Sequence, residues 1–523
     1  NPAPARDVLQ HLPQPRNIGN LPGILPMASP ADIADDLVDR LSGISFDDIF
    51  LKQIRTVVEL HHSSVPMWSE ALAFMMEGII TYAFQATMAP EDQQLAMAYL
   101  KLFFLLPRLL LHSSKGVAVR ARLILTGRLE AFEKLYSESE PEPRVASNHP
   151  TSTLRQQQET INRRVSTLVK SCDLSRAINS LVLPPRVDIT QDVIQKVHEL
   201  HPIAQPEHRI PNSAPTKVNL DPGERIYQFQ LLNRIIKDLK THVAPDTTGL
   251  RPGHIKCIFR GRKGPYSPEV RCRNMLDSLI HYIMSDPERF GEVDLWRYFF
   301  GGKLTLLMQN KVRPISQKNT LLKLINAILG RLHDDELRRS AGPGHLNGKK
   351  DGPLAAAVMA QMELDYAQCN PHQVRCVLVT DAKNAFQSAS RSNCYRLLHG
   401  NEHLKKCLAP FFAMQHKGEQ NIVWAQANLV LKVSSGFTQG DINASKLFTV
   451  NTASLVSGLQ QAALSNQLQE ENATVVAIID DITIMGDLKA VTRAEEVRAD
   501  LQKNPNYLVN PQKQYVYTSH GDD

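Results

Sequence analysis

Two adjacent acids, Asp480 and Asp481, interrupt an apolar run at 475–485 that is rich in β-branched residues. Such a run is typical of buried strands, which rarely carry neighbouring carboxylates because uncompensated charge is costly to remove from water. The pattern therefore predicts a hairpin whose tip exposes both acids. A third acid, Asp381, ends another apolar run at 377–380. Set side by side, these strand ends would form a cage of three carboxylates, which suits hard cations such as Mg²⁺ and two-metal phosphoryl transfer.

The basic residues are concentrated in one part of a chain whose overall composition is ordinary. The 523 residues are 42% hydrophobic and 21% charged, and the net charge of +6 is mildly basic. Residues 301–350 alone carry a surplus of seven positive charges, and a second basic cluster spans 251–273. Both clusters precede Asp381, where contact with nucleic acid or a triphosphate would be useful. Solvated helix faces explain the clusters equally well, so both interpretations stay open.

The cysteines and the apolar segments indicate the compartment. The seven cysteines are dispersed and none forms a CxxC pair, which argues against a zinc finger and suits a reducing environment. The most apolar segment, 102–111, is interrupted by Pro107 and Arg108 and is too short to span a bilayer. We expect a buried helix or helix pair there and no membrane association. No secretory signal is visible, so we expect an intracellular protein of the nucleus or cytoplasm that is not secreted.

The N-terminal 240 residues are predicted to be mainly helical and carry no catalytic pattern. Apolar residues recur there at helical spacing between stretches rich in proline or polar residues. The predicted divisions are a disordered tail at 1–30, a helical N-terminal domain at 31–136, a linker at 137–160, and a helical, proline-rich connector at 161–240. From about residue 226 onward the pattern becomes mixed α/β. Strands are expected near 303–315, 374–380, 421–433 and 474–486.

Two motifs each have a functional and a structural interpretation. Phe386 follows Asp381 by five residues, which would place its ring beneath the sugar of a nucleotide and leave no room for a 2′-hydroxyl. Taken alone, Asp381 is an ordinary helix N-cap and Phe386 a core aromatic. Lys311 and Arg313, on a predicted strand, could clamp the β- and γ-phosphates of a triphosphate. Taken alone, they are surface cations.

A glycine-containing loop precedes a predicted helix at 447–455. Gly436 and Gly440 permit tight backbone geometry and close approach of a ligand. Gln439 and Gly440, at the head of this helix, could contact a base and a sugar, and Asp441 suits a helix N-terminus. Glycine loops before helices are common, so this motif is a weak functional signal by itself and supports a functional interpretation only together with the other motifs.

The order of these motifs along the chain resembles that of a known enzyme family. The order is Arg313-Pro314-Ile315, Asp381, Gln439-Gly440-Asp441, Asp480-Asp481 and Leu508-Val509-Asn510-Pro511-Gln512-Lys513. The chain resembles a reverse transcriptase, most closely those of non-LTR (LINE-like) retrotransposons, over about 240–523. Upstream, 244–251 is similar to the family's APGPDGL opening, and 344–352 is similar to its QLGV…GAE segment in the fingers.

The resemblance implies an α+β right-hand polymerase preceded by an all-α region. Fingers would occupy 241–360 and a C-terminally truncated palm 361–523, and a thumb is expected to be missing because 42 residues follow Asp481. The implied activity is that of an RNA-directed DNA polymerase, which extends a primer 3′-hydroxyl with dNTPs by two-metal nucleotidyl transfer. An RNA template and a DNA primer or target would be its partners, and two Mg²⁺ ions, or Mn²⁺, its cofactors.

The resemblance also implies a role for each matching residue. Asp381 and Asp480 would ligate both metal ions, with Asp481 assisting, so all three are expected to be catalytic. The remaining residues would bind substrates: Phe386 as the sugar gate, Gln439 and Gly440 on template and nucleotide, Lys311 and Arg313 on the triphosphate, and Lys513 near the leaving pyrophosphate.

The sequence departs from the family at two places, and more than one function fits it. Ile478 replaces an aromatic residue two positions before the acid pair, and Asp441-Ile442-Asn443 replaces Asp-Pro-Leu. An RNA-dependent RNA polymerase would share the acids, although Phe386 argues against it. The chain would also fit an inactive retroelement remnant that binds nucleic acid, or a protein whose N-terminal helices bind RNA or a protein partner.

Overall fold

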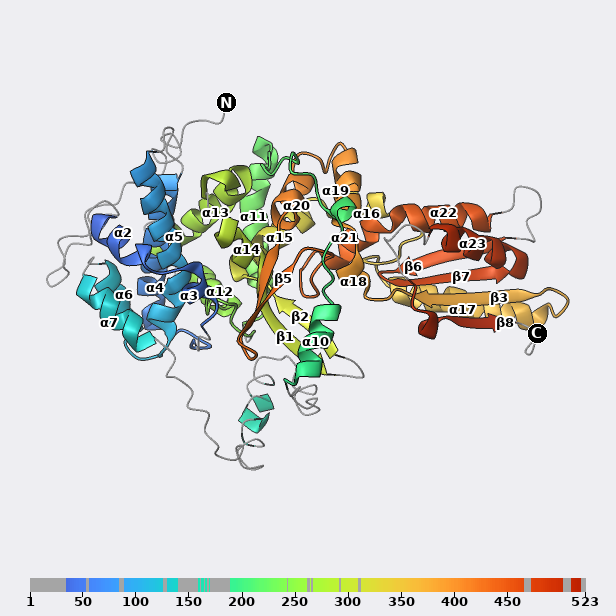
Figure 1. The fold of residues 1–523 in the computed structure, drawn as a ribbon, viewed down its shortest axis with the longest axis horizontal. Coiled ribbons are helices and arrows are strands. Elements are labelled where there is room, and N and C mark those ends of the chain that lie inside the picture. Colours follow the sequence, from blue (N-terminus) through green and yellow to red (C-terminus); the bar gives the residue numbers. More distant parts are fainter. Residues whose placement is uncertain are drawn as a thin grey trace.

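The computed structural model describes most of the chain between residues 34 and 518. Outside the described residues lie 1–33, 53–55, 84–88, 126–128, 140–158, 160, 164, 167–168, 170–188, 242, 261–263, 265–266, 291–292, 309–311, 465–471, 502–508 and 519–523. The predicted tail and nearly all of the predicted linker therefore fall outside them. The described part is α+β, with many helices and two four-stranded sheets. Figure 1 shows an elongated molecule with the N-terminal helices at one end and the second sheet at the other.

The N-terminal helices pack around an apolar pair, α4 (Val65–Ala83) and α5 (Pro90–Leu111). The surrounding helices are α2 (Ala34–Ser42), α3 (Phe46–Phe50), α6 (Val117–Leu125) and α7 (Leu129–Ser139). Among the described residues, α5 is the one helix long and apolar enough to cross a membrane. However, 78% of its most apolar window is buried inside the protein, as in the core helix of a globular domain. The helix expected at 102–111 is therefore present and buried.

The centre of the molecule is mainly helical. Its helices are α11 (Pro222–Asp238), α12 (Pro252–Arg260), α13 (Pro268–Ser285), α14 (Val293–Gly301), α15 (Thr320–Leu332) and α16 (Asp334–Ala341). α13 packs against α4, where Arg271 forms ion pairs with Glu70 and Glu77. The indole N–H of Trp68 on α4 donates to the carbonyl oxygen of His254 on α12 (3.1 Å). One continuous hydrophobic core therefore links the N-terminal helices to the centre.

The first sheet has the strand order β2–β1–β4–β5. Its strands are β1 (Gly302–Met308), β2 (Val312–Gln317), β4 (Gln420–Trp424) and β5 (Leu429–Val433). β1–β2 and β4–β5 are antiparallel pairs, and β1 runs parallel to β4. Val197 of α10 (Gln191–Glu199) packs on this sheet, in a small apolar core with Ile422 and Trp424. The predicted strand regions 303–315 and 421–433 each correspond to one antiparallel pair.

The second sheet is antiparallel and has the strand order β6–β7–β3–β8. Its strands are β3 (Arg375–Asp381), β6 (Ala473–Ile478), β7 (Asp481–Asp487) and β8 (Tyr515–Thr518). β3 and the β6–β7 hairpin correspond to the strands expected near 374–380 and 474–486. The two faces are covered by α17 (Gly352–Cys369) and by α22 (Ala453–Ala463) with α23 (Leu488–Leu501). Successive side chains of β3 point to opposite faces of the sheet. Val377 packs with α17 residues, whereas Leu378 belongs to the main core.

A further segment extends the second sheet beyond β6. The backbone N–H of Leu346 donates to the carbonyl oxygen of Ala477 (2.8 Å), and the N–H of Ala477 donates to that of Gly344 (2.9 Å). His345 forms a parallel bridge with Ala477. The beginning of the 344–352 segment, which the resemblance placed in the fingers, therefore lies along the edge of the second sheet.

Candidate active site

Three carboxylates meet at one end of the second sheet. The register pairs Asp381, the last residue of β3, with Asp481, the first residue of β7. Asp480 lies in the two-residue turn between β6 and β7, next to Ile479. We call Asp381, Asp480 and Asp481 the carboxylate cluster. The structure thus brings together the three acids to which the sequence pointed.

The turn that presents Asp480 has an unusual backbone. Ile479 adopts a φ of 57°, in the left-handed region that β-branched residues rarely occupy. Such a conformation persists only where the surrounding structure enforces it, and it is frequent at functional sites. Here the β6–β7 ladder continues without a gap up to the pair formed by Ile478 and Asp481. The tight turn therefore places Asp480 and Asp481 at successive positions at the end of the sheet.

The electrostatics of the carboxylate cluster disfavour its fully ionised state. Burial and the neighbouring charge of Asp481 raise the pKa of Asp480. Burial and the charge of Asp381 raise the pKa of Asp481. Lys513 opposes both shifts, and its own pKa is raised by its hydrogen bond to Asp381. A divalent cation bound among these oxygens would offset both the burial and the repulsion that raise the two carboxyl pKa values.

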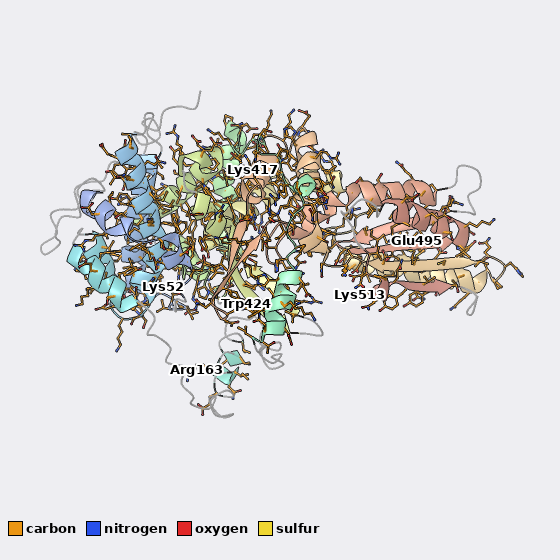
Figure 2. All side chains as sticks on the ribbon, viewed as in Figure 1. Lys52, Arg163, Lys417, Trp424, Glu495 and Lys513 are labelled. Carbon is orange, nitrogen blue, oxygen red and sulfur yellow. The ribbon has the colours of Figure 1, made fainter. Side chains whose placement is uncertain are left out.

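Lys513 lies beside the cluster because the chain returns to β3 at this point. Its ammonium nitrogen is 2.6 Å from the Oδ2 atom of Asp381. The backbone N–H of Asn510 donates to the carbonyl oxygen of Asp381 (2.9 Å). These contacts hold η6 (Pro511–Lys513) against the end of β3. Figure 2 shows Lys513 at the end of the second sheet that faces the centre of the molecule.

Phe386 lies in the short helix α18 (Ala385–Ser388), shortly after the end of β3. The chain enters α18 through Asn384, whose φ is 51°. The ring of Phe386 is half-buried, and its centroid lies 5.5 Å from that of Phe448. Its backbone carbonyl oxygen accepts a hydrogen bond from the N–H of Phe437 (2.6 Å). Phe386 therefore contributes to packing, but its side chain is only half-buried. It lies shortly after β3, the strand that ends in Asp381.

Residues 434–440, which we call the glycine loop, dock on α18. At Gly436, φ is +60° and a Cβ atom would lie 2.2 Å from the carbonyl oxygen of Gln387. A larger residue would therefore require both a strained backbone and a shift of the loop. The buried side chain of Arg391 secures this position, because its Nε atom donates to the Gly436 carbonyl oxygen (2.9 Å).

The far end of the glycine loop docks on the first sheet. The backbone N–H of Ser316 in β2 donates to the carbonyl oxygen of Gln439 (2.7 Å). Gly440 has a φ of +106°, and a Cβ atom there would lie 2.4 Å from the carbonyl oxygen of Ser316. Arg313 is exposed on the same strand. The structure therefore brings Gln439 and Gly440 next to the strand that carries Arg313, whereas Lys311 lies outside the described residues.

Polar side chains stabilise the start of the helix after the glycine loop, α21 (Ala444–Asn451). The carboxylate of Asp441 accepts hydrogen bonds from Gln415 Nε2 (2.6 Å) and Asn326 Nδ2 (3.3 Å). Nδ2 of Asn443 donates to the carbonyl oxygen of Asn326 (2.7 Å). The Asp441-Ile442-Asn443 segment, in which the family's proline is absent, is thus fixed by side-chain contacts.

Two buried cations support this region and were not predicted from the sequence. They are Arg391, at the start of α19 (Arg391–Gly400), and Lys318. Lys318 Nζ donates to the Phe300 carbonyl oxygen (2.5 Å) and to Gln420 Oε1 (3.3 Å). Burial lowers the pKa of Arg391 to about 9 and that of Lys318 to about 8. Their partners are distant in sequence, so no local pattern could have revealed them.

Comparison with known proteins finds no protein-family model and no curated protein that matches the chain. Among solved structures, part of the chain is similar to apo telomerase from Candida tropicalis. The identity is 12% and the TM-score 0.32, over 42% of this chain and 45% of that chain. Telomerase from Candida albicans, in complex with a fragment of telomeric RNA, gives 14% identity and a TM-score of 0.30, over 43% and 44% of the two chains. The chain thus spans less than half the length of either telomerase chain.

Proposed function

We propose that this chain is a reverse transcriptase, an RNA-directed DNA polymerase of a non-LTR-type retroelement. The observation that carries the proposal is the meeting of Asp381, Asp480 and Asp481 at one end of an antiparallel sheet, beside Lys513. Three carboxylates in this arrangement suit metal-assisted transfer of a nucleotidyl group. In this proposal the second sheet belongs to the palm of a right-hand polymerase, whereas the first sheet joins β1 and β2 of the predicted fingers (241–360) to β4 and β5 of the predicted palm (361–523).

The carboxylate cluster fits two Mg²⁺ ions, or Mn²⁺, by the chemistry of its donors. All three groups offer hard oxygen ligands, and the pKa values of Asp480 and Asp481 are raised by burial and by the neighbouring carboxylates, both of which a cation would offset. Asp381 and Asp480 would be the principal ligands, and Asp481 would assist. The chemistry that such ions supply when bound is Lewis-acid neutralisation of phosphate oxygens.

The other proposed site residues would bind and orient the substrates. Lys513 stays protonated because a neighbouring carboxylate raises its pKa, so it can donate hydrogen bonds to the oxygens of a leaving pyrophosphate. Arg313 and Lys311 would hold the triphosphate. Gln439 and Gly440 would position the template base and the nucleotide, since the glycine loop connects α18 to the first sheet.

Phe386 would act as the sugar gate. Its ring is supported from one side by Phe448, so it cannot easily move away from a nucleotide sugar. A fixed ring at this position would exclude a 2′-hydroxyl, which favours dNTPs over ribonucleotides. The proposed partners are therefore an RNA template, a DNA primer or target, and dNTPs, in the nucleus or cytoplasm. An RNA-dependent RNA polymerase is the second candidate, because it would use the same acids.

Primer extension on poly-rA/oligo-dT with Mg²⁺ tests the proposal. We expect the wild-type chain to add dTTP, and Asp480→Asn to lose about a thousandfold or more of this rate, because a metal-binding carboxylate is removed. Asp487→Asn is a matched control, since Asp487 ends β7, the strand that follows Asp480, and lies at the opposite end of the sheet. It should keep nearly all of the activity.

Three different outcomes would redirect the proposal. Equal activity in Asp480→Asn and Asp487→Asn would remove the carboxylate cluster from the mechanism. Preferential use of ribonucleotides would favour the RNA polymerase. Failure of the wild type to extend any primer, with RNA binding retained, would favour the inactive nucleic-acid-binding remnant.

A further inference from the structure

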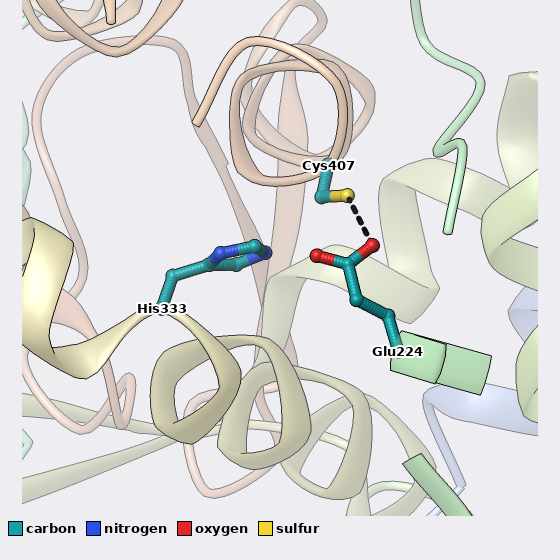
Figure 3. A group of neighbouring side chains, drawn as sticks. All are labelled: Glu224, His333 and Cys407. Atoms are coloured by element: carbon teal, nitrogen blue, oxygen red, sulfur yellow. Dashed lines mark hydrogen bonds between the residues drawn. The ribbon is translucent and has the colours of Figure 1, made fainter. Parts of the chain in front are cut away.

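Three potential metal ligands that do not belong to the carboxylate cluster meet between helices in the centre of the molecule. Glu224 lies in the first turn of α11, His333 between α15 and α16, and Cys407 directly before α20 (Leu408–His416). One ligand atom of each lies within 4.8 Å of the others. Figure 3 shows the imidazole of His333 directed toward the carboxylate of Glu224, with the thiol of Cys407 above that carboxylate and hydrogen bonded to one of its oxygens.

The burial of these side chains distinguishes the cluster from a chance surface group. Cys407 is 1% exposed and His333 is 7% exposed. Nε2 of His333 is buried and has no hydrogen-bond partner among the described residues. An unpartnered polar atom in the interior is costly, so its retention calls for an explanation. A bound metal ion would be the missing partner.

The other two side chains are held in place by the backbone. Oε2 of Glu224 accepts a hydrogen bond from the N–H of Asp221 (3.0 Å), which completes the capping box of α11. The thiol of Cys407 donates to the carbonyl oxygen of Asn219 (3.1 Å) and faces Oε2 of Glu224 at 3.8 Å. The second carboxylate oxygen of Glu224 can therefore bind an ion without loss of the helix cap.

We propose that Glu224, His333 and Cys407 bind one Zn²⁺ ion, with a water molecule as the fourth ligand. A set of one sulfur, one nitrogen and one oxygen suits zinc, whereas Mg²⁺ and Ca²⁺ prefer oxygen alone. Ligand atoms around a tetrahedral zinc are about 3.5 Å apart, given bond lengths of about 2.0–2.3 Å. The three side chains would therefore need to close by about an ångström.

The charges balance when the ion binds. In the metal-free protein the Cys407 thiol is protonated, because burial raises its pKa to about 12, and burial keeps His333 neutral by lowering its pKa. On binding, the S–H bond breaks, a Zn–S bond forms and one proton leaves to solvent. One thiolate and one carboxylate then neutralise the two positive charges of Zn²⁺, so the buried site carries no net charge.

The proposed ion would connect three segments that are distant in sequence. It would fasten the start of α11 to the α15–α16 junction and to the start of α20. None of the residues proposed for nucleotidyl transfer belongs to this site. We therefore assign the zinc a structural role, which would be present whether or not the chain is a polymerase.

Metal content and Co²⁺ spectroscopy test the site on the full chain. We expect about one zinc per wild-type chain after dialysis with Zn²⁺, and less than a tenth of that in Cys407→Ser. Cys369→Ser is the matched control, because Cys369 is exposed, and should bind zinc like the wild type. His333→Gln gives a second variant if Cys407→Ser fails to fold. Zinc absent from the wild type, or equal in wild type and Cys407→Ser, would overturn the proposal.

Co²⁺ in place of Zn²⁺ reports the ligands directly in the wild-type protein. We expect a thiolate-to-cobalt charge-transfer band and the ligand-field intensity of a four-coordinate ion, with release of one proton per ion. A spectrum without the thiolate band, or binding without proton release, would overturn the assignment of Cys407. This experiment does not depend on polymerase activity or on the folding of any variant.

Discussion

The carboxylate cluster and the site around the buried side chain of Arg391, which we call the Arg391 site, both concentrate charge, but they balance that charge in different ways. At the Arg391 site, one buried guanidinium donates to carbonyl oxygens from two separate segments of the chain. At the carboxylate cluster, the pKa values of Asp480 and Asp481 are raised, so the surroundings disfavour the charged forms. The first arrangement is complete within the chain and serves architecture. The second would be relieved by the cation proposed above, and such perturbed groups are frequent at functional sites.

A single buried charge, the guanidinium of Arg391, holds two segments of the chain together through hydrogen bonds. Its acceptors are the carbonyl oxygens of Ser435 and Gly436 in the glycine loop and of His416 and Gly418 at the end of α20. Both segments lie next to elements that carry proposed substrate-binding residues. A loop fixed in this way can present Gln439 in a constant position.

The largest effect on stability is expected when the buried, hydrogen-bonded charge of Arg391 is removed. Arg391→Met would leave several carbonyl oxygens buried without donors, so we expect the free energy of unfolding to fall by about 3–5 kcal/mol. Urea unfolding followed by circular dichroism measures this change. Arg396→Met is the control, because Arg396 is exposed on the same helix and donates to Asn393. If both variants unfold at the same urea concentration, the Arg391 site is not the architectural element described above.

The same contrast explains what could be predicted from the sequence. Asp381, Asp480 and Asp481 each interrupt or end an apolar run, and their pairing follows once two hairpin strands are placed beside β3. Because acids are rare within or beside the apolar runs of buried strands, they stand out in a single sequence. The two sheets also followed from periodicity, at the level of where strands occur.

The internally satisfied groups could not be predicted in this way. Arg391 and Lys318 look like ordinary surface cations, because their carbonyl and amide partners come from remote segments. Glu224, His333 and Cys407 are spread over more than 180 residues of the sequence. Glu224 also belongs to the capping box of α11, so in the sequence it looks like part of an ordinary helix start. Such contacts depend on tertiary packing, which neither residue spacing nor composition encodes.

A smaller effect is expected at Phe386, which lies shortly after β3 and is held in place by packing. We expect Phe386→Ala to raise the use of ribonucleotides relative to dNTPs by about tenfold, because removal of the ring leaves space for the 2′-hydroxyl. The ratio of kcat/KM for UTP and dTTP measures the change. Phe386→Tyr keeps the bulk of the ring and should keep the selectivity. An unchanged ratio in Phe386→Ala would leave Phe386 as a core aromatic only.

The smallest effect is a gain in stability when an acid of the cluster is neutralised. The folded protein raises the pKa of Asp480, so stability is lost as the pH rises through that raised value. Asp480→Asn removes this loss. We expect its Tm to exceed that of the wild type by about 1–2 °C at pH 7.5, measured by differential scanning fluorimetry without divalent ions. The difference should shrink as the pH falls toward 3.8, the ordinary carboxyl pKa.

Added Mg²⁺ should reduce the difference in Tm between Asp480→Asn and the wild type, because an ion that binds the folded state stabilises it. Added Mg²⁺ should raise the Tm of the wild type more than that of Asp480→Asn, and Asp487→Asn should respond like the wild type. A variant that is less stable than the wild type at every pH would mean that Asp480 is satisfied within the chain, like Arg391. In that case the carboxylate cluster would be an architectural site, and the contrast between the two regions would disappear.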